Sequence, residues 1–313
     1  MIYTVRGAIP KSELGVTLEH EHVKWEYDEC LANTMYFDKK YQEESIQSDL
    51  EYIVPILLDI KEKGGKSVVE ASPPIGGQNI KLLNELSKRA DMNIIPCTGW
   101  NMTKQLYDVF PKYFEEQLAN RWIKDFKEGL DTIDGIDIRP GYIKLLLDRG
   151  LLSNADKAML IAAVKASKET GMPIHCHILE AKMVHEVIQV LDKEEADYNK
   201  FLWAHADEEA HKETVKLAAE KGMWIGIDNV RKGTSKKELE LFNYVLSLGF
   251  GHKVLLSQDY DFYTEAKKSL EEHPCTTIFD EFIPYCSENG IEKQEIIRIM
   301  TENPANFYDV DME

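Results

Sequence analysis

Short apolar runs alternate along the chain with longer segments in which apolar residues recur at helical spacing. Several of the runs carry almost no polar residue, which is typical of strands buried on both faces of a parallel sheet. The pattern predicts strands at residues 15–18, 66–72, 93–98, 141–147, 172–177, 201–205, 223–228 and 253–259. Between the strands, helices are predicted to begin near Ser48, Asn79, Thr103, Ala181, Asp207, Ser235 and Cys275, in addition to the one at 153–171. The segment 103–130 has room for two helices.

The clearest helical segment is 153–171. Ser153 or Asn154 can cap its start, and Gly171 followed closely by Pro173 ends it. Eight predicted strands, each followed by a predicted helix, indicate a (β/α)8 TIM barrel. The alternative is an open doubly wound sheet, which usually has a glycine-rich phosphate loop after its first strand. Here the first strand runs into His-Glu-His instead, which disfavours that alternative.

Composition narrows the class of protein. The 313 residues are 43% hydrophobic and contain no linker-like tract, so we expect one domain spanning 1–313. The net charge of −18 argues against nucleic acid or an anionic membrane surface as a partner. No secretory signal is visible, and the longest apolar run, 52–60, is too short to span a membrane. Five widely spaced cysteines without a C-x-x-C pair indicate reduced thiols and a cytoplasmic location.

Polar residues with metal-binding chemistry occur at the ends of different predicted strands, which meet at one mouth of a barrel. His20 and His22 are two positions apart, so both side chains can face the barrel axis. The other strand-end candidates are Lys144, His175, His177, His205 and Asp259. Imidazoles gathered with a carboxylate form a set of metal ligands.

Each of these residues also has a simpler explanation. A single strand-end histidine such as His205 is more often a structural or surface residue than a ligand. Lys144 can pair with a carboxylate, and Asp259 can cap the next helix. Their joint occurrence at the same end of several strands favours one cause, which is a metal site.

The order of these residues resembles the phosphotriesterase-related group of the amidohydrolase superfamily. The matching segments are LGVTLEHEHV, CTGWN at 97–101, YIK at 142–144, ETGMPIHCH at 169–177, AHAD at 204–207 and TENPANFY at 301–308. The resemblance covers nearly the whole chain and implies the barrel fold, a small-molecule substrate and a homodimer.

The resemblance also implies two divalent metals, most often zinc, with manganese or cobalt as alternatives. It assigns His20, His22 and Asp259 to the first metal and His177 and His205 to the second. Lys144, carboxylated on its ε-nitrogen, would bridge them, because a free ammonium has no lone pair for a metal. His175 would then lie behind the ligands, and Cys176 would point into the helix layer.

The activity implied is hydrolysis, in which a metal-bridging hydroxide opens a lactone and Asp259 acts with Lys144 as a catalytic residue. Trp100, Arg149, Arg231 and Tyr260 are the expected substrate contacts, with the two arginines facing a phosphate on a sugar lactone. Asn229 stands where relatives often have a histidine or arginine, which leaves the proton-relay residue open.

Three alternatives remain at this point. The first is a phosphotriesterase or another ester or amide hydrolase. The second is a metal-binding barrel without catalytic activity, which the complete ligand set disfavours. The third is a one-metal deaminase-like relative, in which Lys144 would have little to do.

Overall fold

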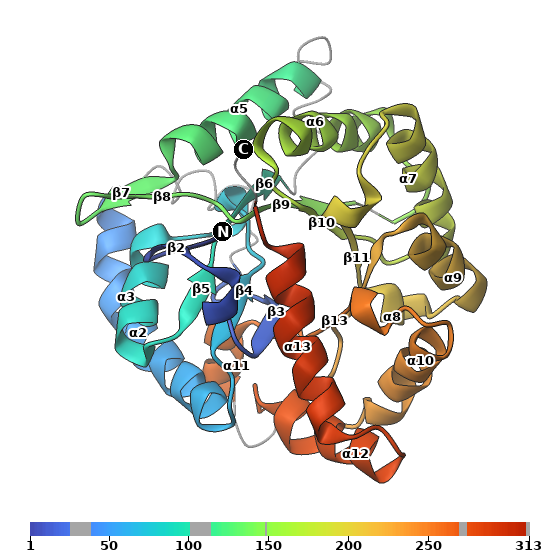
Figure 1. Ribbon diagram of the computed structural model, residues 1–313. Coiled ribbons are helices and arrows are strands. Elements are labelled where there is room, and N and C mark those ends of the chain that lie inside the picture. Colours follow the sequence, from blue (N-terminus) through green and yellow to red (C-terminus); the bar gives the residue numbers. More distant parts are fainter. Residues whose placement is uncertain (26–38, 101–113, 148, 269–273, 311–313) are drawn as a thin grey trace.

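A computed structural model describes residues 1–25, 39–100, 114–147, 149–268 and 274–310, and Figure 1 shows its ring of helices around a barrel of strands. All ladders within the barrel are parallel, in the orders β13-β12-β11-β10-β9-β6 and β3-β4-β5. The predicted (β/α)8 barrel is therefore confirmed. The barrel strands are β3 (Thr17–Glu21), β4 (Ser67–Glu70), β5 (Asn93–Ile95), β6 (Cys97–Trp100), β9 (Tyr142–Leu146), β10 (Ile174–His177), β11 (Phe201–Ala204), β12 (Trp224–Ile227) and β13 (Val254–Leu256).

The third barrel strand is broken, whereas the first and last differ from their predictions at their ends. β3, expected over 15–18, spans Thr17–Glu21, and β13, expected over 253–259, ends at Leu256. The sequence predicts one strand over 93–98, but the structure divides it at Pro96 into β5 and β6. Proline has no amide hydrogen for a ladder, so the pairing changes there. β5 pairs with β4, and β6 pairs with β9 on the other side. Two antiparallel hairpins that the sequence reading did not predict, β1–β2 (Ile2–Thr4, Gly7–Ile9) and β7–β8 (Asp131–Ile133, Ile136–Ile138), lie outside the barrel wall.

The helices follow the strands, but the helix expected to begin near Ser48 already begins at Lys39. They are α2 (Lys39–Glu62), α3 (Ile80–Ala90), α5 (Phe114–Glu128), α6 (Asn154–Thr170), α7 (Ala181–Lys193), α8 (Ala206–Glu209), α9 (Lys212–Lys221), α10 (Ser235–Ser247), α11 (Phe262–Lys268), α12 (Ile283–Glu288) and α13 (Lys293–Phe307). Ser153 caps α6 in a capping box with Asp156, and Gly171 ends α6 with φ 74°. The helix expected near Asp207 is two helices, α8 and α9, and the start expected at Thr103 lies outside the described residues.

The first and last barrel strands, β3 and β13, share no regular ladder in the described chain. Backbone hydrogen bonds just beyond β13 close this gap instead. Asp259 N donates to His20 O at 3.0 Å, and His22 N donates to Tyr260 O at 2.8 Å. We call the junction of residues 20–22 with residues 257–262 the seam. The predicted ligands from the first and last strands lie on its two sides.

Apolar side chains fill the barrel at the end opposite the predicted ligands. Ile95, Leu202 and Leu255 form one buried cluster there with two aromatic residues. These are Phe307, the last residue of α13, and Tyr308, which follows it. In Figure 1, α13 crosses the barrel at this end. The closed end leaves the carboxyl ends of the strands as the place for a ligand cavity. Among the described helices, none has the length and apolar character needed to cross a membrane.

Candidate metal centre

A cavity of about 270 Å³ opens at the carboxyl ends of the barrel strands. All six predicted metal ligands line it, although they come from five different strands or strand ends. The lining residues are His20, His22, Trp25, Pro73, Lys144, Leu146, His177, His205, Asp259 and Asp261. The structure therefore brings the predicted ligand set together at one place.

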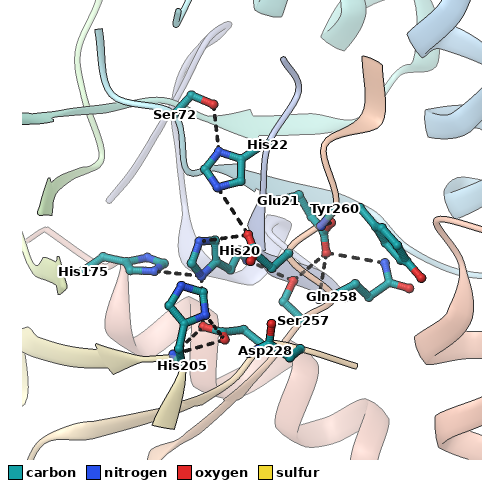
Figure 2. Close-up of polar contacts among 12 residues, drawn as sticks. His20, Glu21, His22, Ser72, His175, His205, Asp228, Ser257, Gln258 and Tyr260 are labelled. Atoms are coloured by element: carbon teal, nitrogen blue, oxygen red, sulfur yellow. Dashed lines mark hydrogen bonds and ion pairs between the residues drawn. The ribbon is translucent and has the colours of Figure 1, made fainter. Parts of the chain in front are cut away.

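His20 and His22 are each held by a hydrogen bond to the same ring nitrogen, Nδ1 (Figure 2). The Nδ1 atom of His20 lies 2.9 Å from Asp228 Oδ2, and the Nδ1 atom of His22 lies 2.9 Å from Ser72 Oγ. A ring nitrogen that donates to a neighbouring oxygen leaves the lone pair of the other nitrogen for a metal. Both histidines are thus oriented with Nε2 as the available ligand atom.

His205 is held in the same manner from the other side. Its Nδ1 atom lies 2.7 Å from Asp228 Oδ1, and its backbone N–H donates to the same carboxylate at 3.0 and 3.1 Å. These bonds accompany a backbone φ of +63°, a region that residues other than glycine seldom adopt. Asp228 is completely buried and contacts both His20 and His205.

Asp259 faces the two N-terminal histidines across the seam. Its Oδ1 atom lies 3.3 Å from His22 Nε2 and 3.5 Å from His20 Nε2. Asp259 also has a left-handed backbone, with φ of +52°. Strained backbone at a cluster of polar residues is common at functional sites. The three side chains have ligand atoms close enough to share one cation.

Lys144 projects from β9 into the cavity, and its Nζ atom lies 2.9 Å from His20 Nε2. Its side chain is 2% exposed, and this burial lowers its pKa below the ordinary lysine value. Gly99 of β6 makes this position possible, since a Cβ atom there would lie 1.9 Å from the Lys144 carbonyl oxygen. The CTGWN motif therefore has a steric reason for its glycine.

His177 closes the set, with its ring centroid 4.3 Å from that of His205. Burial lowers the His177 pKa well below its ordinary value, so the ring is held neutral. Within the described chain, no group hydrogen-bonds to this ring. A half-buried imidazole that receives no hydrogen bond from the described chain, beside other imidazoles, a carboxylate and a lysine, fits a divalent cation of the zinc type.

His175 lies beneath the ligands. Its Nε2 atom is 3.3 Å from His20 Nδ1, and its Nδ1 atom is 3.2 Å from the Tyr308 hydroxyl. Cys176, between the two histidines of β10, is fully buried in the outer apolar core, and burial raises its thiol pKa.

Three of the predicted substrate contacts, Arg149, Arg231 and Tyr260, are not among the described residues that line the cavity. The Arg231 guanidinium contacts the Asp259 backbone oxygen and lies 3.6 Å from its carboxylate. It also stacks over Tyr260, which is 1% exposed and shares a hydrogen bond with Thr277. Arg149, on the loop after β9, pairs with Glu208 of α8 at 3.6 Å. Trp100 ends β6, and its side chain is outside the described part of the structure.

Several site residues were not singled out from the sequence. Trp25 lines the cavity, and its ring packs edge-on against His22 with centroids 4.8 Å apart. Asp228 ends the seventh predicted strand, so its position could have marked it as a strand-end carboxylate. Ser72 ends the second predicted strand in the same way, but a serine at a strand end does not by itself indicate a contact with a metal ligand.

Asn229 makes polar contacts of its own. Its backbone N and its side-chain Nδ2 donate to Asp207 at 2.8 and 3.1 Å. Asp207 is fully buried and contacts Glu238 in the first turn of α10. Asn229 thus fixes the carboxylate two residues after His205, and an amide carries no proton between groups at neutral pH.

The fold and the site together define a class: a metal-dependent hydrolase built on a (β/α)8 barrel. A profile of the phosphotriesterase family matches residues 1–308, and the chain belongs to that family. An aryldialkylphosphatase from Saccharolobus solfataricus is 27% identical over 97% of this chain and 98% of its own length. A phospho-furanose lactonase from Mycoplasmopsis synoviae is 24% identical over 98% and 91%. An N-acetyltaurine hydrolase from Xenopus tropicalis is 22% identical over 98% and 97%.

Proposed function

We propose that this hydrolase holds two divalent cations and opens the ring of a lactone. The observation that carries the proposal is the single cavity at the strand ends. Four imidazoles, the carboxylates of Asp259 and Asp261 and a buried lysine line it together. Trp25, Pro73 and Leu146 form the apolar part of its wall. The family to which the chain belongs consists of enzymes with two metals, which agrees with this set.

The cations would divide the donors between them. His20, His22 and Asp259 would hold the first, as their mutual distances of 3.3 and 3.5 Å support. His177 and His205 would hold the second, and their rings lie side by side. Zinc suits imidazole and carboxylate ligands, with manganese or cobalt as substitutes.

Lys144 would join the two halves after carboxylation. Its neutral amine attacks the carbon of CO2, an N–C bond forms, and a proton leaves the nitrogen to give a carbamate anion. Burial lowers the pKa of Lys144 and so favours the neutral amine that this step requires. The carbamate would also replace the close approach of an ammonium to His20 Nε2 with an oxygen ligand.

Bound cations would polarise the oxygen of the substrate carbonyl and acidify a water molecule. Asp259 would orient the attacking water and accept its proton, because its carboxylate lies at the cavity wall beside both N-terminal histidines. Asp228 would keep His20 and His205 in the tautomer that presents Nε2. Trp25, Pro73 and Leu146 would exclude water around the substrate ring.

The substrate proposed is a sugar lactone that carries a phosphate. The name of the relative from Mycoplasmopsis synoviae supports this class. Of the two arginines, Arg149 is the better phosphate contact, since its side chain is 58% exposed and its ion pair within the described residues is the 3.6 Å contact with Glu208. Arg231 is engaged by Asp259 and Tyr260 and would rather support that loop.

A substrate panel tests this function. Purified protein loaded with zinc is given neutral and phosphorylated lactones of one sugar, a chromogenic phosphotriester and an N-acyl amide. We expect the phosphorylated lactone to give the highest kcat/KM, and Arg149→Ala to raise KM for that substrate alone. Equal turnover of the two lactones would remove the phosphate contact. Preference for the phosphotriester or the amide would favour the activities named for the other relatives.

A further inference from the structure

Glu21 lies in the sequence between the predicted ligands His20 and His22, but its carboxylate points across the seam toward the end of β13 (Figure 2). The side chain is completely buried. A buried carboxylate needs hydrogen-bond donors around it, and here all of them come from residues on the far side of the seam.

The donors to Glu21 flank Asp259 on both sides. Ser257 Oγ donates to Oε1 at 2.8 Å, and Gln258 N donates to the same atom at 3.0 Å. Tyr260 N donates to Oε2 at 3.0 Å. One carboxylate therefore holds the backbone immediately before and immediately after Asp259, whose own backbone is left-handed.

A second contact returns to the ligand side of the seam. The Ser257 hydroxyl that donates to Glu21 also accepts from His20 N at 3.0 Å. His20, Ser257 and Glu21 thus form a closed set of hydrogen bonds between the two edges of the barrel. Because no regular ladder joins β3 to β13 in the described part of the chain, these bonds and a few backbone contacts fix the separation of the edges.

We propose that Glu21 is a positioning residue that sets the distance of Asp259 from His20 and His22, and thereby the metal affinity of that half of the centre. The inference rests on the proposed function for the identity of these ligands. Glu21 points away from the cavity lining and does not touch the metal position itself. Its effect passes through the backbone of Gln258 and Tyr260.

The test is zinc titration by calorimetry of metal-free wild-type and variant protein at one fixed pH. Glu21→Gln keeps the size of the side chain but turns an NH2 group toward a donor, so one side of Asp259 is released. We expect one of the two zinc equivalents to bind at least about tenfold more weakly and the other to bind as in the wild type. Loss of a hydrogen bond that orients a metal ligand commonly lowers metal affinity by this amount.

Asp125→Asn is the matched control. Asp125 is a buried carboxylate that accepts from Thr98 Oγ1 at 2.6 Å and from Arg121 at 2.7 Å, away from the seam. We expect this variant to lose stability but to bind both zinc equivalents like the wild type. An equal loss of zinc affinity in both variants would show a general effect of destabilisation and would overturn the inference.

Ser257→Ala is the milder variant, which removes one donor to Glu21 and the acceptor of His20 N. We expect a smaller weakening of the same single equivalent. Wild-type zinc binding in Ser257→Ala and in Glu21→Gln, or in Ser257→Ala alone if the other variant does not fold, would refute the positioning role. Failure of the wild type to bind zinc would instead refute the proposed function.

Discussion

Asp228 joins His20 and His205 with its two carboxylate oxygens. Oδ2 lies 2.9 Å from His20 Nδ1, and Oδ1 lies 2.7 Å from His205 Nδ1. The two histidines belong to different halves of the proposed centre. A single buried residue of β12's end therefore orients a ligand in each half.

Asp228→Asn is expected to disturb both halves together. An amide has one oxygen and one NH2 group, so only one of the two imidazoles can still donate to it. We expect zinc affinity to fall by about 10- to 100-fold, with a matching fall in kcat at limiting zinc. Metal analysis after dialysis against a weak chelator measures the loss. Two full equivalents of zinc in the dialysed variant would contradict this role.

Lys144→Ala is expected to remove the bridge between the cations. Less than two equivalents of zinc should then remain bound, and turnover should fall by at least about 100-fold. A short carboxylic acid added to the assay should restore part of both, since it supplies the missing oxygens. Full zinc content and the wild-type rate without any added acid would disprove the assignment of Lys144.

Asp259→Asn is expected to keep the barrel but lose most of the activity. The amide cannot accept the proton of the attacking water, and loss of such a group commonly reduces the rate by about 10²- to 10⁴-fold. Circular dichroism checks the fold, and kcat on the best lactone checks the function. The proposal fails if the variant, loaded with two zinc equivalents, turns over at the wild-type rate.

Gly99→Ala is expected to separate β6 from β9 at the site. Its Cβ atom would lie 1.9 Å from Lys144 O and 2.8 Å from Lys144 N, which are backbone atoms that cannot rotate away. We expect a loss of about 3 kcal/mol or more in the free energy of unfolding, measured by urea denaturation. Gly249→Ala is the control, because Gly249 also has a positive φ but no atom within 4 Å of the added carbon. That variant should lose only about 1 kcal/mol. Equal losses would place the cause in the backbone angle rather than in the contact with Lys144.

Glu238→Gln is expected to change the pH dependence of stability. Burial, together with the neighbouring Asp207, raises the pKa of Glu238 to about 9. The folded chain therefore keeps a proton that the unfolded chain releases above its ordinary pKa near 4.5. The contribution of Glu238 to the free energy of unfolding is therefore complete below about pH 4.5. It falls as the pH rises toward 9, by up to about 1.4 kcal/mol per pH unit.

The glutamine variant carries no titrating group at this position, so this decline should be absent. Urea unfolding of both proteins at pH 5, 7 and 8.5 measures the difference, which should shift steadily in favour of the variant. Glu220→Gln, at an exposed position on α9, should follow the wild type at every pH. Parallel pH curves for Glu238→Gln and the wild type would contradict the protonated state of Glu238.

The strand pattern was sufficient to predict the barrel because its walls are buried on both faces and read as apolar runs. The break at Pro96 was visible in the sequence, but its effect depends on which neighbour each half pairs with, and that is set by tertiary structure. The hairpin β7–β8 was missed because its residues are largely exposed and have no buried face to create a pattern.

The candidate ligands could be predicted because each lies in a recognisable strand or just after one. The surrounding contacts could not, since they depend on side chains from distant parts of the chain. Tyr260 is adjacent to Asp259, and yet it packs toward Thr277 beneath Arg231. Trp25 reaches the cavity from the loop after β3, where no periodicity indicates its direction.

The seam also has a consequence for the order of events during biosynthesis. The hydrogen bonds of Glu21 connect positions separated by 236 to 239 residues. None of them can form until the ribosome has released the eighth strand, so a truncated nascent chain lacks Asp259 and the frame that holds it. In the proposed centre, the first metal position would therefore be complete only in chains whose translation is nearly finished, and incomplete products would bind zinc poorly.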